Sequence, residues 1–203
     1  MTGKLIGVGV GPGDPELMTL KAVKIIENAA VIAIPDTGGE SGVAFDIASK
    51  IIDMSQKEQL KLHMPMTRDQ NLLNQSHDTA AAHIIEKLDL GLDVVFLTLG
   101  DPTVYSTYIY IQRKVAAAGY ETEIAEGIPS FCAAAARLNI ALCEGAEALH
   151  IIPASYPDDS WLHLQGTKVL MKSGRSFDKV RQQLADHGLL EKAVMVERCT
   201  MEN

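Results

Sequence analysis

The chain has 203 residues, of which 47% are hydrophobic and 22% are charged, a balance that is ordinary for folded proteins and excludes disorder as the main state. Its net charge of -8 and its aromatic content of only 5% argue against nucleic acid and anionic membrane surfaces as partners. An anionic small ligand would therefore need a pocket that gathers a minority of basic side chains.

Segments of strand length alternate with segments of helical period along the whole chain. In chain order the pattern predicts a strand at 5–10, a helix at 15–29, a strand at 31–34, helices at 43–52 and 79–88, a strand at 94–99, a helix at 104–118, a strand at 121–125, a helix at 130–138, strands at 148–152 and 167–171, a helix at 177–187 and a strand at 193–197. The run at 94–99 is almost continuously apolar, which is typical of a strand covered on both faces. This order predicts an α/β fold.

A domain boundary is expected near Gly119, where a helix ends and a new cycle of strand and helix begins. It separates an N-terminal α/β domain, residues 1–118, from a C-terminal α/β domain, residues 119–203. No linker rich in Pro or Ser lies between them, so we expect the two domains to pack closely around a cleft. The chain stops at Asn203, just after an expected strand, and we therefore expect the second domain to be truncated at its C-terminus.

The cysteines indicate a reducing compartment. Cys132, Cys143 and Cys199 form no CxxC pair, and their odd number argues against a disulfide framework. We expect free thiols, with Cys132 a small core residue of an alanine-rich helix. The first apolar run contains glycine and ends at Pro12, so it is too short and too broken for a signal peptide or a membrane span. These features predict a cytoplasmic protein.

Two Gly-Asp-Pro turns are the most informative local pattern. Gly13-Asp14-Pro15 and Gly100-Asp101-Pro102 each follow an expected strand. In such a turn the Asp oxygen can accept from free amides at the start of a helix, and Pro suits the first helical position. The turns are either two helix caps and nothing more or parts of a site, because ligands of open α/β sheets bind just outside the carboxyl ends of strands. The pattern leaves both interpretations open.

The ligand that these loops would suit carries no phosphate. A third glycine of the G-x-G-x-x-G fingerprint would have to fall at Pro12 or Asp14, and no Walker A lysine follows either loop. A phosphate cradle needs free amide donors and positive potential, whereas Pro12 and Pro15 remove donors and Asp14 adds a negative charge. A carboxylate such as that of Asp101 suits hydroxyls or cationic groups instead. S-adenosylmethionine has a sulfonium, an ammonium and a ribose, and no phosphate.

Four segments resemble, in order, the signatures of the tetrapyrrole (corrin/porphyrin) methylase family. They are residues 8–22, 97–107, 126–131 and 169–172. Within the family, residues 64–67, 105–107 and 171–172 are most similar to the branch that methylates C20 of precorrin-2 or cobalt-factor II in cobalamin biosynthesis. The resemblance implies two α/β domains that hold S-adenosylmethionine in the cleft between them, and a homodimer. It also implies S-adenosylhomocysteine as product and a tetrapyrrole as substrate.

The resemblance also assigns residues to the two ligands. The residues implied in the cofactor pocket are Leu99, Gly100, Asp101, Val104, Pro129, Ser130 and Met171. The glycine loop, residues 9–14, is implied to face the tetrapyrrole, with Gly11, Pro12 and Asp14 as contacts. The resemblance also implies a final β segment that contributes to the adenine pocket, which we expect to lie beyond Asn203.

The remaining candidate residues are basic, aromatic, histidine and serine side chains outside the glycine loop. Four basic residues are candidates for binding substrate carboxylates, with solvated surface charge an equal alternative for each: Arg68, Lys172, Arg175 and Arg198. Tyr105 is a hydrogen-bonding candidate in catalysis, and the base that deprotonates C20 is not identified. The six histidines lack metal-ligand spacing, so we expect no protein-bound metal, and any cobalt would belong to the substrate. Ser130 is a cap or a ligand hydrogen bonder.

Two alternative functions remain: a different activity within the same family, and a function of a non-enzymatic class. One is a family member that acts on a different ring carbon, or on a protein or RNA, although the acidic charge argues against RNA. The other is a non-catalytic module that binds a nucleotide or metabolite, since a fold does not fix a function.

Overall fold

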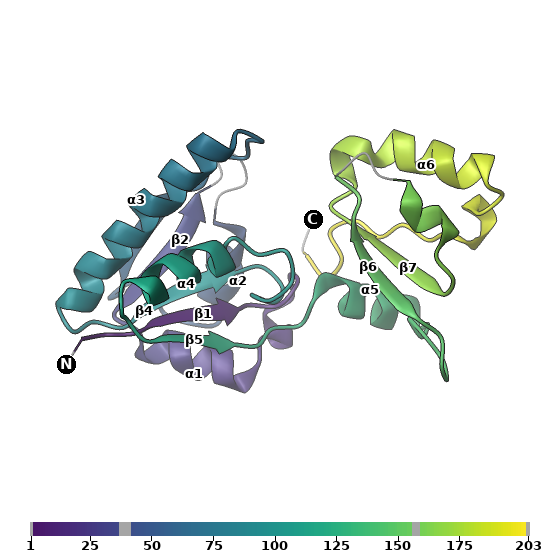
Figure 1. Cartoon of the computed structure of the whole chain (residues 1–203). Coiled ribbons are helices and arrows are strands. Elements are labelled where there is room, and N and C mark those ends of the chain that lie inside the picture. The colour runs from purple at the N-terminus through teal and green to yellow at the C-terminus, as the bar shows by residue number, and fades with distance from the viewer. Residues whose placement is uncertain (1, 37–41, 156–158, 202–203) are drawn as a thin grey trace. The chain divides into compact units, whose positions relative to one another are not determined.

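The computed structural model describes residues 2–36, 42–155 and 159–201, drawn in colour in Figure 1. It divides the chain into two compact units, one of residues 1–130 with 198–203 and one of residues 131–197. The expected boundary at 118/119 is therefore wrong. The strand β5 (Thr122–Ala125) pairs with β1 (Leu5–Gly9) in the sheet of the first unit, and this pairing moves the boundary past it.

The first unit is built on a parallel sheet of five strands in the order β3-β2-β4-β1-β5. The three strands not yet defined are β2 (Val31–Asp36), β3 (Glu58–His63) and β4 (Val94–Thr98). Every residue of the central strands β1 and β4 is buried, as expected for continuously apolar strands covered on both faces. The expected α/β fold is confirmed.

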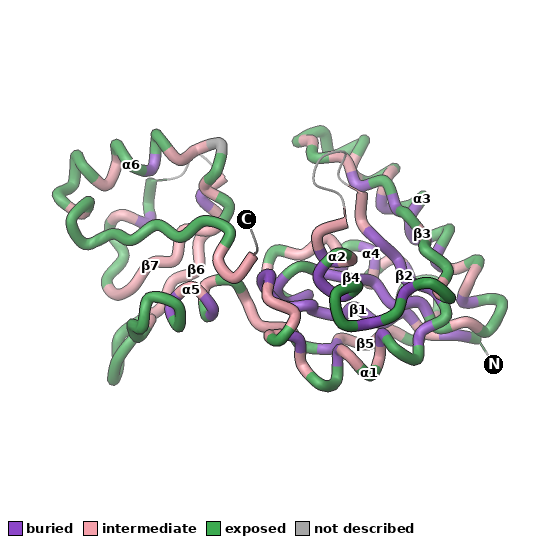
Figure 2. Tube along the Cα trace, turned by 180° about the vertical axis from the view of Figure 1, so that it is seen from behind, coloured by how far each residue is buried: buried purple, intermediate pink, exposed green. Residues whose placement is uncertain are grey.

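Helices cover both faces of this sheet. They are α1 (Leu20–Asn28), α2 (Val43–Ser49), α3 (Gln70–Asp89) and α4 (Tyr108–Ala117). One buried cluster joins α1 and α2 to side chains such as Ile6 and Leu97, and the other joins α3 and α4 to side chains such as Leu5 and Phe96. Neighbouring strand residues thus serve opposite cores. Figure 2 shows the buried residues concentrated along these strands.

The second unit contains a smaller sheet. Its strands β6 (Leu149–Pro153) and β7 (Thr167–Met171) are parallel and paired along their full length. The helix α5 (Ser130–Leu138) begins at the unit boundary, and α6 (Phe177–Asp186) follows β7. All five residues of each strand are only partly buried.

Two expectations for residues 131–197 are wrong. Residues 193–197 form no strand, and Val194 and Met195 are 65% and 59% exposed despite their apolar character. Cys132 is exposed rather than buried, because α5 turns Ala133 and Ala135 toward the interior instead. The three cysteines are free thiols, as expected.

The first unit departs from the predicted elements in several places, one of which is α3, which begins at Gln70 and not at residue 79. The sequence pattern missed β3, because this edge strand is mostly polar and buries only Leu62. The expected helix at 15–29 is divided into a 3-10 turn, Pro15–Leu17, and α1, which Thr19 caps by accepting from the amide of Ala22 at 3.1 Å. The helix α4 begins at Tyr108, four residues later than expected. None of the helices in the described part of the chain is long and apolar enough to cross a membrane.

Candidate functional site

The candidate site lies at the carboxyl ends of the neighbouring strands β1 and β4. The Val10 amide donates to the carbonyl of Thr98 at 2.9 Å, and the next residues reverse direction to form an antiparallel bridge between Gly11 and Gly100. In that bridge the Gly100 amide donates to Gly11 O at 2.8 Å, and the Gly11 amide donates to Gly100 O at 3.3 Å. Both glycines have a positive φ, +74° and +76°. The two loops that the sequence singled out therefore meet directly.

Three glycines allow three strand exits to approach each other. A Cβ on Gly9 would lie 2.5 Å from the carbonyl oxygen of Gly100 and 2.6 Å from the Cα of Gly127. A Cβ on Gly127 would overlap the Gly100 carbonyl oxygen itself and lie 2.8 Å from the Cα of Gly9. The exits of β1, β4 and β5 are thus packed backbone against backbone.

Asp101 joins the exits of β4 and β5. One carboxylate oxygen, Oδ2, accepts from the Gly127 amide at 2.8 Å, while Oδ1 accepts from the amide of Thr103 at 2.8 Å and from its hydroxyl. Burial alone would raise the pKa of the Asp101 carboxyl, but these donors outweigh it and hold the pKa below its ordinary value. The expectation that Asp101 is a helix N-cap is wrong, because α4 begins only at Tyr108.

Asp14 behaves as the sequence predicts. Its side chain accepts from the amide of Glu16 at 2.9 Å, and Pro15 occupies the first position of the 3-10 turn. Its carbonyl accepts from Leu17 at 3.0 Å, and its own amide donates to Thr200 Oγ1 at 3.1 Å. Neither Thr200 nor Thr103 was predicted at the site. Thr103 lies only two residues after Asp101, whereas Thr200 is 186 positions from Asp14 and leaves no local sequence signal.

The segment after β4 exposes apolar and aromatic side chains. Leu99 is 45% exposed between the buried residues Thr98 and Gly100, and Tyr105 is 41% exposed. Tyr105 has a φ of +47°, an uncommon conformation for a residue with a side chain and one that clusters at ligand sites. Val104, just before it, is half-buried. This loop offers apolar surface that a bound ligand would cover.

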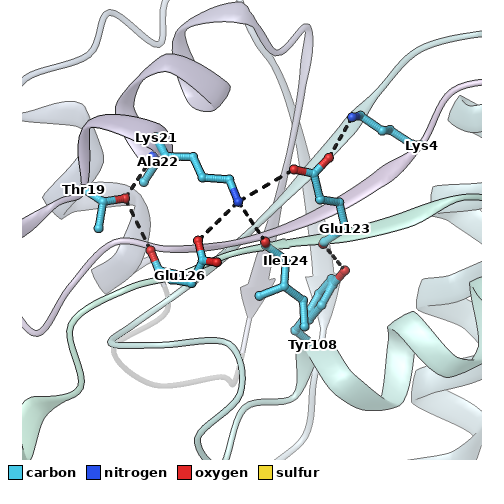
Figure 3. Close-up of polar contacts among 8 residues, drawn as sticks. All are labelled: Lys4, Thr19, Lys21, Ala22, Tyr108, Glu123, Ile124 and Glu126. Carbon is cyan, nitrogen blue, oxygen red and sulfur yellow. Dashed lines mark hydrogen bonds and ion pairs between the residues drawn. The ribbon is translucent and has the colours of Figure 1, made fainter.

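Lys21 and its acidic partners hold α1 to the end of β5 (Figure 3). Its ammonium lies 3.2 Å from Glu126 and 3.9 Å from Glu123, and it donates to the carbonyl of Ile124 at 3.3 Å. Glu123 also pairs with Lys4 at 2.8 Å. Such part-exposed pairs each contribute little to stability, but together they position the residues that precede Gly127.

A buried tyrosine packs against strand β1. The hydroxyl of Tyr108 donates to the carbonyl of Glu123 at 2.7 Å (Figure 3), and a Cβ on Gly7 would lie 2.5 Å from its ring. Burial raises the pKa of Tyr108 to about 12, so the phenol keeps its proton at neutral pH. Tyr108 is therefore part of the scaffold of the first unit.

The other predicted residues divide between the two units. Pro129 and Ser130 follow the β5 exit, and a Cβ on Gly100 would lie 4.0 Å from the Cα of Pro129. Arg68 is exposed between β3 and α3. In the second unit Met171 ends β7 and Lys172 follows it with a φ of +59°. Arg175 lies in the 3-10 turn Gly174–Ser176, and its side chain lies outside the described set.

The charges at the strand exits of the first unit suit a cation better than a phosphate. Asp14, Asp101 and Glu126 all follow strands of the sheet and bring carboxylates to this edge. A sulfonium or an ammonium fits this environment, together with the apolar surface of Leu99. Across the described ranges, no three His, Cys, Asp or Glu side chains gather as a metal site would require.

Comparison with known sequences gives consistent matches. The family model of the tetrapyrrole (corrin/porphyrin) methylases matches residues 4–203. A probable cobalt-precorrin-2 C(20)-methyltransferase of Methanocaldococcus jannaschii is 34% identical over 87% of this chain and 75% of its own length. A precorrin-2 C(20)-methyltransferase of a Sinorhizobium species is 33% identical over 99% of this chain and 86% of its own length. A cobalt-precorrin-2 C(20)-methyltransferase of Salmonella typhimurium is 31% identical over 99% and 86%.

Comparison with solved structures supports the fold. A cobalt precorrin-4 methyltransferase superposes with a TM-score of 0.68 at 23% identity and covers 91% of this chain and 75% of its own. A uroporphyrin-III C-methyltransferase from Thermus thermophilus, solved in complex with S-adenosylhomocysteine, superposes with a TM-score of 0.64 at 21% identity and covers 92% and 77%. At these identities the likeness establishes the architecture.

Proposed function

The chain belongs to the tetrapyrrole (corrin/porphyrin) methylase family, and on that premise we propose that it transfers a methyl group from S-adenosylmethionine to C20 of precorrin-2 or cobalt-factor II in cobalamin biosynthesis. The observation that carries the proposal is the agreement among relatives from an archaeon and two bacteria. Each is 31–34% identical over most of this chain, and each bears the name of a C20-methylating enzyme. The strand exits of the first unit carry acidic side chains, which suit a cationic ligand without phosphate such as S-adenosylmethionine.

The chemistry asks for positioning more than for reactive side chains. When bound, S-adenosylmethionine supplies an electrophilic methyl group on a sulfonium, and the C20 carbon of the macrocycle is an electron-rich, enamine-like nucleophile. A carbon–carbon bond forms at C20 as the carbon–sulfur bond breaks, and a proton then leaves C20. The contribution of the protein is to align the two reactants in line and to exclude water, which lowers the barrier by several kcal/mol or more.

We propose that seven residues contact the cofactor. The set is Leu99, Gly100, Asp101, Val104, Pro129, Ser130 and Met171. Leu99 supplies exposed apolar surface, and the bridge between Gly11 and Gly100 fixes the backbone beside it. Asp101 acts mainly by fixing this loop, because its carboxylate already accepts three hydrogen bonds. Tyr105 is proposed to hydrogen-bond to a reactant from its left-handed backbone position.

We assign the substrate contacts to the glycine loop and to basic residues. Gly11, Pro12 and Asp14 form the loop side of the tetrapyrrole site. Arg68, Lys172 and Arg175 bind the peripheral carboxylates, which a chain with a net charge of -8 must neutralise locally. The functional form is proposed to be a homodimer in the cytoplasm.

A methyl-transfer assay tests the function. The protein is incubated with methyl-labelled S-adenosylmethionine and, separately, with precorrin-2 or cobalt-factor II, and the labelled ring position is read by NMR. We expect label at C20, and calorimetry should show binding of S-adenosylhomocysteine and none of ATP or NAD. Label at another ring carbon would move the protein to another branch of the family. Cofactor binding with no transfer to either substrate would favour a binding module.

A further inference from the structure

Residues 198–201 return to the first unit after the second one and contact the glycine loop, residues 9–14. The Asp14 amide donates to Thr200 Oγ1 at 3.1 Å. A Cβ on Gly13 would lie 2.7 Å from Cγ of Met201 and 2.9 Å from its amide nitrogen. The stretch 198–201 therefore packs directly on the loop, and glycine at position 13 leaves it the room.

The hydroxyl of Thr200 satisfies a donor that the loop itself leaves open. Pro12 and Pro15 have no amide hydrogen, so between them only Gly13 and Asp14 can donate. The carboxylate and the carbonyl of Asp14 are both used inside the turn. The bond to Thr200 spans 186 positions of sequence and so ties the turn to a distant part of the chain.

The backbone of this stretch is held in an unfavourable conformation. Thr200 has a φ of +66° and Arg198 a φ of +49°. A β-branched residue rarely adopts the left-handed region, and such strain persists only where the surroundings fix it. Thr200 is thus held where its hydroxyl reaches the loop, at a conformational cost that another residue such as Asn or Gly would largely avoid.

We infer that Thr200 is a positioning residue for the tetrapyrrole: its hydroxyl fixes the glycine loop in the conformation that receives the macrocycle. The inference rests on the proposed function, which assigns substrate contacts to this loop. Thr200 acts through Asp14 and not on the reacting atoms. Its loss should therefore affect substrate binding without affecting the cofactor.

The test uses Thr200→Val, which keeps the β-branch and the backbone strain but removes the hydroxyl. We expect the KM for the tetrapyrrole to rise about threefold to tenfold, the value of one neutral hydrogen bond, with kcat and S-adenosylhomocysteine affinity unchanged. Thr200→Ser should restore the wild-type KM. The control is Thr79→Val on α3, which removes a hydroxyl that donates to the carbonyl of Gln75 at 3.0 Å, away from the glycine loop.

Hydrogen exchange provides a second readout that needs no substrate. A peptide covering residues 12–15 reports only two amides, and we expect faster exchange in Thr200→Val and wild-type exchange in Thr200→Ser and Thr79→Val. An unchanged KM in Thr200→Val, with or without faster exchange, overturns the inference. A lower KM overturns it too, because the stretch would then obstruct the loop. If the wild-type protein methylates neither substrate, the proposed function fails, while exchange still shows whether Thr200 holds the loop.

Discussion

Replacing Asp101 by asparagine tests whether its carboxylate makes a tertiary structural contact or is an ordinary helix cap. A capping Asp is exchanged for Asn with little loss, because Asn is an equally good cap. At Asp101, however, both oxygens accept: Oδ1 from Thr103 and Oδ2 from the amide of Gly127. Asparagine has one carbonyl oxygen, so its NH₂ group must face one of these backbone amides, donor against donor.

The cost follows from the contacts that are lost. A hydrogen bond to a charged group contributes about 1.5–3 kcal/mol, and an unsatisfied buried donor costs about 1–3 kcal/mol. Asp101 is only 8% exposed, so water does not replace the lost partner. We expect Asp101→Asn to lower the free energy of unfolding by about 2–4 kcal/mol, which for a chain of this size lowers Tm by roughly 5–15 °C.

Thermal unfolding followed by circular dichroism measures this effect. The matched control is Asp69→Asn, because the single oxygen Oδ1 of Asp69 caps α3 by accepting from the amides of Asn71 and Leu72. The control should melt within about 2 °C of the wild type. If Asp101→Asn also melts there, the carboxylate does not tie the two strand exits together and the reasoning is refuted.

The pKa shift of Asp101 adds a test with a defined sign. Its pKa is lower in the folded protein than the ordinary value of 3.8. The stabilisation is therefore complete above about pH 4 and is lost as the pH falls through the folded-state pKa. The difference in Tm between wild type and Asp101→Asn should shrink below pH 4. A difference that grows with acid would contradict the assignment.

Two further predictions concern the ligands. Gly100→Ala and Gly119→Ala each place a Cβ at a positive φ, +76° and +94°, and should cost a similar 1–2 kcal/mol or so of stability, but only Gly100→Ala should weaken S-adenosylhomocysteine binding in calorimetry. Equal cofactor affinity in the two variants would remove Gly100 from the pocket. Arg68→Ala should weaken tetrapyrrole binding about tenfold in a fluorescence titration, leave cofactor affinity unchanged and reduce the salt dependence of binding. Unaltered tetrapyrrole affinity would place Arg68 among the solvated surface charges.

The sequence predicts best where one local pattern has one physical cause. The strand β7 and the helix α5 occupy their predicted residues, and β4 covers residues 94–98 of the predicted run 94–99 and is buried throughout. The edge strand β3 escaped because Glu58–His63 lacks the apolar alternation, and the pairing with β2 decides its conformation. Residues 193–197 show the reverse, a strand-like sequence that finds no partner strand within the described ranges.

The sequence was enough to locate the candidate site, but not to predict the contacts that form it. The carboxyl ends of β1 and β4 were predictable, because the two Gly-Asp-Pro turns follow strands. The contacts that define the site come from residues far away in sequence, such as Gly127 for Asp101 and Thr200 for Asp14. Such pairs depend on strand order, and one sequence does not fix the order.

The Gly-Asp-Pro tripeptide therefore makes different contacts at its two positions. In Gly13-Asp14-Pro15 the carboxylate accepts from Glu16, two residues on, and the bond from the distant Thr200 uses only the backbone amide of Asp14. Asp14→Asn keeps both interactions, so we expect its Tm to stay within about 2 °C of the wild type. Asp101→Asn loses an accepted hydrogen bond at a strand exit and should melt far lower. A pair of variants with equal Tm values would mean that both turns are helix-type caps, as the local sequence alone suggests, and that the tertiary bond to Gly127 contributes nothing.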